Sequence, residues 1–210
     1  MKLTVINKLN TMESIFIKKL TLVSKIFLPT ITCFILVYSF QKLDFFKYSS
    51  FYYTILSFGI LITIFNLKKI RYGIIINLIS SISLSFLVFF LSLVIEGGLI
   101  YLYEELLIIF SLDFMKPIAI KQQENIISVA ILSPILMFYS YKLLFQIKNN
   151  RYFKVTALIS IIILLVLRLT NLMIEEIHLF IYWQTIMFLA LQVILYEDEL
   201  KILFRPNKKN

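Results

Sequence analysis

The sequence predicts an all-α, polytopic integral membrane protein with about six transmembrane helices and with both termini in the cytoplasm. Three observations predict this fold class. Hydrophobic residues make up 60% of the 210 positions, whereas soluble domains contain about 45–50%. These residues gather in long runs that are typical of membrane helices. Lysine and arginine residues cluster between the runs, and no soluble domain fits there, so residues 1–210 are expected to form a single membrane domain.

Six apolar runs are predicted to be the transmembrane helices, because a helix needs about 20 apolar residues to cross the hydrocarbon core. The predicted spans are residues 24–41, 49–67, 73–95, 126–145, 155–174 and 178–196. Pro29 is expected in the first turn of the first span, where a missing N–H is tolerated. Pro134 is expected to kink the fourth span, with its freed backbone groups bonded by Ser133 or by a neighbouring helix.

The charge distribution supports this division of the chain. Of the 21 lysine and arginine residues, 16 fall in residues 1–25, in the turns at 68–72 and 142–154, and in the cytoplasmic tail at 197–210. Cytoplasmic segments of membrane proteins carry such an excess of positive charge. The opposite side receives most of the acidic residues: Asp44, Glu96, Glu104, Glu105, Asp113, Glu124, Glu175 and Glu176. The basic charge therefore indicates topology, and no nucleic-acid partner is predicted.

The N-terminal segment, residues 1–23, is predicted to lie on the cytoplasmic face as an amphipathic interfacial helix. Its apolar residues recur every three or four positions and form one stripe, made of Val5, Leu9, Met12, Phe16 and Leu20. The lysines lie off this stripe, which favours attraction to anionic lipid of the inner leaflet. The alternative interpretation is a frayed basic tail.

Residues 99–115 are apolar enough to resemble a seventh span, but Glu104 and Glu105 lie in the middle. A charge at the centre of a bilayer costs about 2.5–3.5 kcal/mol. A span here would also place every later loop on the opposite side of the membrane. We therefore expect an amphipathic or re-entrant helix on the outer face, entered through a break at Gly97 and Gly98.

A second group of polar residues is expected on the outer side, around the stretch IEEIHLF at 174–180. A solvated turn between the fifth and sixth helices is the simplest interpretation. Together with the fifth helix and the outer segment, this turn forms a candidate functional cluster of Arg168, Asn171, Glu175, Glu176, His178, Glu104 and Glu105. No catalytic residue, cofactor or metal site is predicted, because zinc needs three or four ligands, chiefly His and Cys, and the chain has one of each.

Arg168 is expected inside the fifth span, roughly 10 Å from its outer end at about 1.5 Å per residue. A charge at that depth should be paired or should reach toward the headgroups. One interpretation is that Arg168 fixes helix packing through an outer carboxylate. The other is that it contacts an anionic substrate, or carries a coupling charge in a complex.

Three further features complete the polar pattern. Asn77, Ser81 and Ser85 share one stripe of the third span, which indicates close helix packing or a polar conduit. Trp183 is expected in the aromatic belt at the outer end of the sixth helix. The consecutive acidic residues of the tail form a candidate docking site for a partner: Glu197, Asp198 and Glu199.

These observations favour a non-enzymatic multi-pass membrane subunit, acting as a scaffold, sensor or immunity or defence component of a larger assembly. Its expected partners are the lipid bilayer and another protein or a second copy of the chain. The heavy use of Ile, Phe, Lys and Asn indicates an AT-rich coding sequence, which is common in low-GC bacteria, so the bacterial inner (plasma) membrane is the predicted location. Two alternatives remain: a small-solute transporter or its substrate-binding membrane subunit, and an intramembrane enzyme with an outer-face acidic and histidine site.

Overall fold

The computed structural model describes residues 2–43, 50–109, 126–170, 172 and 176–204, and it forms helices without a strand in these ranges. The helices are α1 (Lys2–Lys42), α2 (Ser50–Phe65), α3 (Ile74–Ile109), the π-helix η3 (Ser128–Leu132), α5 (Ser133–Leu144), α6 (Arg151–Leu169), α7 (Glu176–Leu195) and α8 (Glu197–Phe204). An isolated antiparallel bridge between Ile70 and Phe145 joins the two connecting segments beside α2 and α5. Helices suit an apolar sequence because they satisfy their backbone hydrogen bonds internally.

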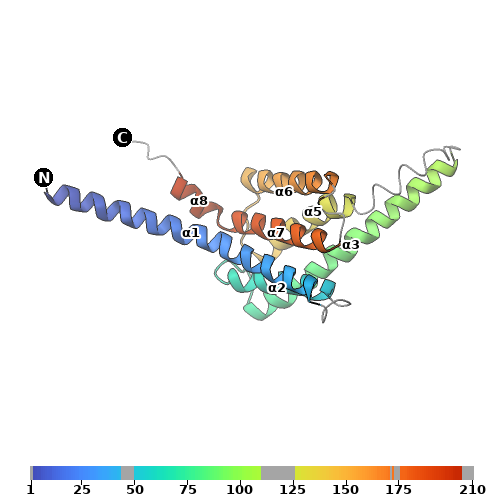
Figure 1. Cartoon of the computed structure of the whole chain (residues 1–210), viewed down its shortest axis with the longest axis horizontal. Helices are drawn as coiled ribbons and strands as arrows, with labels where there is room; N and C mark the ends of the chain where they lie inside the picture. Colours follow the sequence, from blue (N-terminus) through green and yellow to red (C-terminus); the bar gives the residue numbers. More distant parts are fainter. Residues whose placement is uncertain (1, 44–49, 110–125, 171, 173–175, 205–210) are drawn as a thin grey trace.

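The helices pack as a bundle in which α1 contacts α7 and α2, α2 contacts α3, and α3 contacts α5 (Figure 1). α6 covers the other side of α7. The N-terminal part of α1 and the far part of α3 extend from opposite ends of the bundle (Figure 1). α8 contacts α1 at the end from which the N-terminal part of α1 projects.

The predicted class of helical, multi-pass membrane protein is supported by four helices of the described residues. They are long and apolar enough to cross a membrane: Phe16–Lys42, Ile74–Tyr103, Arg151–Leu169 and His178–Leu195. The other two predicted spans coincide with shorter apolar helices, Ser50–Phe65 and Ser128–Leu144. The six-span count with both termini in the cytoplasm therefore remains a prediction.

The predicted N-terminal interfacial helix and the predicted first span form one continuous helix, α1, of 41 residues. No residue near position 23 interrupts the backbone hydrogen bonds, so nothing ends the first helix before the second begins. Pro29 consequently lies inside α1, and its expected place in a first turn is wrong. Its neighbour Thr30 is buried and donates its hydroxyl to the Ile26 carbonyl, 2.8 Å away.

The predicted break at Gly97 and Gly98 is also wrong, because α3 continues through both residues to Ile109. Glycine permits a break but does not impose one, and leucine and glutamate residues that favour a helix follow the pair. Residues 110–115 of the predicted outer segment lie outside the described residues, as do 205–210 of the tail. The first part of that tail forms α8.

The fifth predicted span begins earlier and ends earlier than expected. Asn150 is the N-cap of α6, and its side-chain oxygen accepts a hydrogen bond from the Phe153 N–H at 2.9 Å. This capping interaction satisfies one of the free N–H groups at a helix start. α6 ends at Leu169, with Thr170 as its C-cap.

The contact between α2 and α3 is close because Gly59 lies against the backbone of Ile82. A Cβ atom built on Gly59 would come within 2.8 Å of the Ile82 Cα atom and 2.9 Å of its nitrogen. Membrane helices often approach each other at such small residues. Any side chain larger than the hydrogen of glycine would therefore force the backbones of α2 and α3 apart at this position.

We expect Gly59→Ala to lower the thermal stability of the protein in detergent, since the added methyl group meets backbone that cannot rotate away. Overpacking of this kind costs about 1–3 kcal/mol. Gly98→Ala is the matched control, because nothing lies within 4 Å of its added Cβ atom and alanine stabilises a helix interior by about 0.5–1 kcal/mol over glycine. Equal changes in melting temperature for the two variants would contradict the close contact.

Candidate functional site

A row of buried polar side chains runs along the face of α3 that packs on α2 and α5. We call this row the polar file; it consists of Asn77, Ser81, Ser85, Ser92 and Glu96, each at most 3% exposed. The first three residues form the stripe predicted from the sequence. Ser92 and Glu96 extend it over the helix, because positions four and seven apart share a helix face.

The middle of the file is organised around the hydroxyl of Tyr141, which α5 places in the core with no exposed surface. The Tyr141 oxygen lies 2.9 Å from the Ser81 hydroxyl and 2.7 Å from the Ser85 hydroxyl. Ser81 also lies 3.0 Å from the carbonyl oxygen of Gly59 on α2. The hydroxyls therefore link three helices, which confirms the interpretation of close packing with hydrogen bonds between helices for Ser81 and Ser85 of the stripe.

A second hydroxyl pair lies further along α3. Ser133 donates to Ser92 at 2.9 Å, and Ser92 donates to the Val88 carbonyl at 2.6 Å. One turn beyond, the Glu96 carboxylate accepts a hydrogen bond from the backbone N–H of Ile127 at 3.2 Å. This carboxylate thus bonds the chain where it enters the next helix.

The π-helix η3 faces this part of the file and is explained by Pro134. The proline has no N–H, and its ring clashes with the carbonyl four residues before it in a regular α-helix. The Ser133 N–H accordingly donates to the Ser128 carbonyl, five residues earlier, which is the spacing of a π-helix. The indole N–H of Trp183 donates to the Val129 carbonyl at 2.9 Å. A neighbouring helix thus bonds the irregular backbone, as predicted. The place of Trp183 in an aromatic belt stays a prediction.

A narrow cavity of about 30 Å³ lies between the two hydroxyl pairs. It is lined by Ile55, Phe58, Ser85, Phe89, Val129, Ser133, Met137, Leu179, Phe180, Trp183 and Gln184. Gln184 is 2% exposed, and its amide nitrogen donates to the Thr54 carbonyl at 3.0 Å. Its side-chain oxygen has no hydrogen-bond partner within the described residues.

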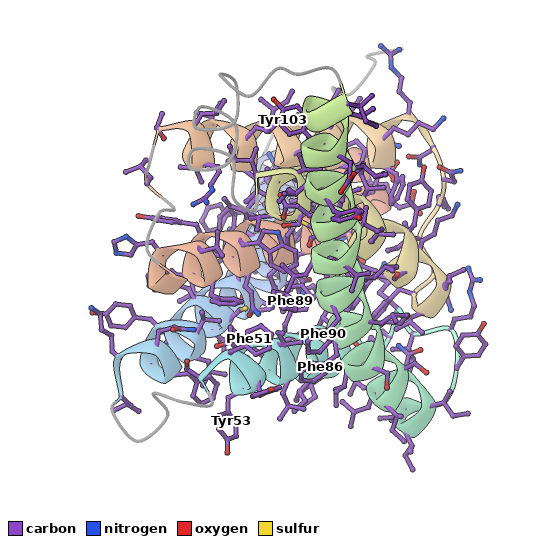
Figure 2. All side chains as sticks on the ribbon, turned by 90° about the vertical axis from the view of Figure 1, so that its right-hand side faces the viewer. Phe51, Tyr53, Phe86, Phe89, Phe90 and Tyr103 are labelled. Carbon is purple, nitrogen blue, oxygen red and sulfur yellow. The ribbon has the colours of Figure 1, made fainter. Side chains whose placement is uncertain are left out.

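Two aromatic residues that line the cavity, Phe89 and Phe180, also pack against a ring at the start of α2. Phe51 packs against Phe89 and Phe180, with ring centroids 4.5 Å and 5.5 Å from its own. Figure 2 shows Phe51 beside Phe86, Phe89 and Phe90, between α2 and α3. The cavity is therefore apolar over most of its wall, with the two serines and Gln184 as its polar groups.

A separate ionic junction joins α8 to the bundle. Glu199 is bonded by Lys25 of α1 at 3.2 Å and by Lys69, in the segment after α2, at 3.1 Å. Both ammonium groups also lie over the ring of Tyr196, 5.4 Å and 5.1 Å from its centroid. Burial alone raises the pKa of Glu199, but the bonds from Lys69 and Lys25 outweigh it and hold the pKa below its usual value.

The other two acidic residues of the candidate docking site are also paired within the chain. Asp198 accepts a hydrogen bond from Lys148 at 2.7 Å. Glu197 accepts from the Asn150 amide at 2.8 Å and pairs with Lys201 one turn along α8. Docking of a partner on these three acidic residues stays a prediction. Within the chain, their carboxylates hold α8 against three other segments.

The structure describes only some residues of the predicted outer cluster. Asn171 and Glu175 lie outside the described residues, and the side chains of Glu176 and Glu104 are not described. Arg168 lies in the last turn of α6, because that helix ends at Leu169 instead of reaching 174. The two remaining members, Glu105 on α3 and His178 on α7, are exposed.

Arg168 and His178 each interact with a neighbour, and the His178 ring lies 6.1 Å from that of Tyr182. A cation in the last turn of a helix also interacts favourably with its carbonyl end. Among the described residues, no group of three or more His, Cys, Asp or Glu side chains could hold a metal ion.

No protein-family model matches the sequence, and searches of curated proteins and of solved structures find no match.

We expect Glu199→Gln to lower the melting temperature at neutral pH, because it removes two partly exposed ion pairs that together contribute on the order of 1 kcal/mol. The folded-state pKa of Glu199 is lowered. Its stabilising contribution is therefore present above the unfolded pKa of about 4.3 and is lost as the pH falls through the folded value.

The measurement is the melting temperature of both proteins from neutral pH downward, with Glu105→Gln, on the exposed part of α3, as the control. The difference between wild type and Glu199→Gln should shrink below the usual glutamate pKa. A difference that stays constant with pH would show that the ion pairs do not stabilise the fold.

Proposed function

We propose that this chain is a non-enzymatic, multi-pass membrane subunit that works as a scaffold or sensor within a larger assembly. The proposal includes six spans, both termini in the cytoplasm, and location in a bacterial inner membrane. An immunity or defence role is one form that such an assembly takes.

The observation that carries the proposal is the exposed apolar arm of α3, residues 97–109. Seven large hydrophobic side chains of this arm are 36–69% exposed: Leu99, Ile100, Tyr101, Leu102, Tyr103, Leu106 and Ile109. Figure 2 places Tyr103 at the far end of α3, away from Phe86, Phe89 and Phe90 in the bundle. Exposed apolar patches of this kind mark sites of protein or membrane contact.

The length of α3 argues for a protein partner on part of this arm. α3 has 36 residues, which corresponds to roughly 54 Å at about 1.5 Å per residue. The hydrocarbon core is about 30 Å thick, so a large part of the arm extends beyond it when the helix crosses steeply. An apolar helix with this reach is well suited to pack against helices of another subunit.

The ionic junction at α8 supports the proposed topology. Three basic segments that the charge pattern puts in the cytoplasm contribute Lys25, Lys69 and Lys148 to the acidic residues of α8. The three basic segments therefore meet at one end of the bundle. Further basic side chains of the same segments are exposed at Lys18, Lys19, Lys68 and Arg71, which favours contact with anionic lipid headgroups of the inner leaflet.

We expect the tagged protein, purified from its native membrane in a gentle detergent, to carry a stoichiometric protein partner or to form a defined homo-oligomer. The mass of the intact complex tests this. Leu102→Asp combined with Leu106→Asp should release the partner, because charges then replace two exposed contact side chains of the arm. Glu105→Gln on the same arm is the control and should retain it. A wild-type monomer would contradict the proposal.

The topology is tested by labelling single cysteines in a Cys33→Ser background. Lys68→Cys and Glu105→Cys both place the thiol at an exposed position, on opposite sides in the proposed topology. A membrane-impermeant maleimide should label position 105 in spheroplasts and position 68 only after the membrane is opened. Labelling of position 105 only from the cytoplasmic side would remove the six-span arrangement.

A further inference from the structure

We propose that the polar file of α3 holds a chain of water molecules and conducts protons across the bundle. This activity goes beyond the proposed role as a subunit. It is carried by the unpartnered Gln184 oxygen in the cavity and by the hydroxyl pairs on either side of that cavity.

The polar file is as long as the membrane core. Asn77 and Glu96 are its two ends, and the helix between them covers roughly 28 Å at about 1.5 Å per residue. The hydrocarbon core measures about 30 Å. A row of packing contacts alone would not need buried polar groups over this whole distance.

Buried polar atoms without a partner lie at both ends of the file as well as in its middle. Within the described residues, such atoms include both side-chain atoms of Asn77, one carboxylate oxygen of Glu96 and the Gln184 oxygen. Gln192, one turn before the end of α7, is fully buried with both side-chain atoms unpartnered. Buried water molecules are the usual partners of such groups.

The cavity joins the two hydroxyl-bonded parts of the file. Ser85 belongs to the Tyr141 group and Ser133 to the Ser92 group, and both line the same cavity. Its volume is about 30 Å³, and one water needs roughly 10–15 Å³ by this measure. Two waters would therefore fit, and they could bond both serines while donating to Gln184.

The chemistry of the file suits protons better than other ions. A hydroxyl or water oxygen accepts a proton on a lone pair and releases its own proton to the next oxygen, so one proton leaves for each proton that enters. Ser81, Tyr141 and Ser85 supply such oxygens. The amides of Asn77 and Gln184 orient the waters, and the free oxygen of Glu96 receives the proton at its end. A cavity for two waters is too small for a hydrated sodium or potassium ion.

The test is proton flux into liposomes that contain the purified full-length chain. The liposomes enclose a pH-sensitive dye, and a potassium diffusion potential with valinomycin drives protons inward. Wild type should acidify the lumen at least about 10-fold faster than protein-free liposomes. Ser85→Ala, Tyr141→Phe and Glu96→Gln should each reduce this flux about 10-fold.

Ser83→Ala is the matched control, because Ser83 is exposed on the same helix two residues from Ser85, and it should conduct like wild type. Gln184→Leu keeps the side-chain volume but removes the carbonyl that orients the waters, and should also block the flux. It serves as a second variant if one of the hydroxyl variants does not fold, as judged by size-exclusion chromatography. Flux equal to protein-free liposomes, or equal in Ser83→Ala and the file variants, would overturn the proposal.

The outcome is independent of the partner experiment, since a monomer can conduct and an assembled subunit can be impermeable. Repeating the assay with an inward sodium gradient and a sodium-sensitive dye separates proton permeability from sodium permeability. The expected sodium flux is that of protein-free liposomes, whereas sodium entry equal to proton entry would overturn the assignment to protons.

Discussion

The close approach of α2 and α3 at Gly59 determines where the polar groups of the core meet. With Ile82 in contact with Gly59, the neighbouring Ser81 comes within hydrogen-bond distance of the Gly59 carbonyl and of Tyr141. A larger residue at position 59 would separate the helices and break both contacts. Packing and hydrogen bonding therefore depend on one another here, since a buried hydroxyl is stabilising only when its partner is within reach.

The two ends of the bundle differ in chemistry. At the α8 end, lysines from three segments converge on the acidic residues of that helix. At the other end, the arm of α3 presents apolar side chains that the described part of the bundle leaves exposed. One end therefore has α8 held by ion pairs within the chain, and the other offers an apolar surface for contact with lipid or with another protein. This asymmetry agrees with a subunit that docks through α3.

The polar file lies in the interior of the bundle, along α3 between the start of that helix and its exposed arm. Its hydroxyls hold helices together and at the same time form a row of exchangeable protons, and one set of residues can serve both purposes. Pro134 contributes by widening the start of the α5 segment into a π-helix, which brings Ser133 beside Ser92 and leaves the Val129 carbonyl for Trp183. Such π segments occur frequently at functional sites.

The helical class, the approximate position of the apolar helices and the stripe of Asn77, Ser81 and Ser85 could be predicted from the amino-acid sequence. These properties follow from local periodicity and from the composition of the apolar runs, which a linear sequence contains. That Tyr141, Gln184 and Trp183 complete the site could be seen only in the folded chain, because these residues lie dozens of positions from their partners in the sequence. The continuity of α1 and α3 was likewise missed, since glycine and charged residues permit a break in a helix without imposing one.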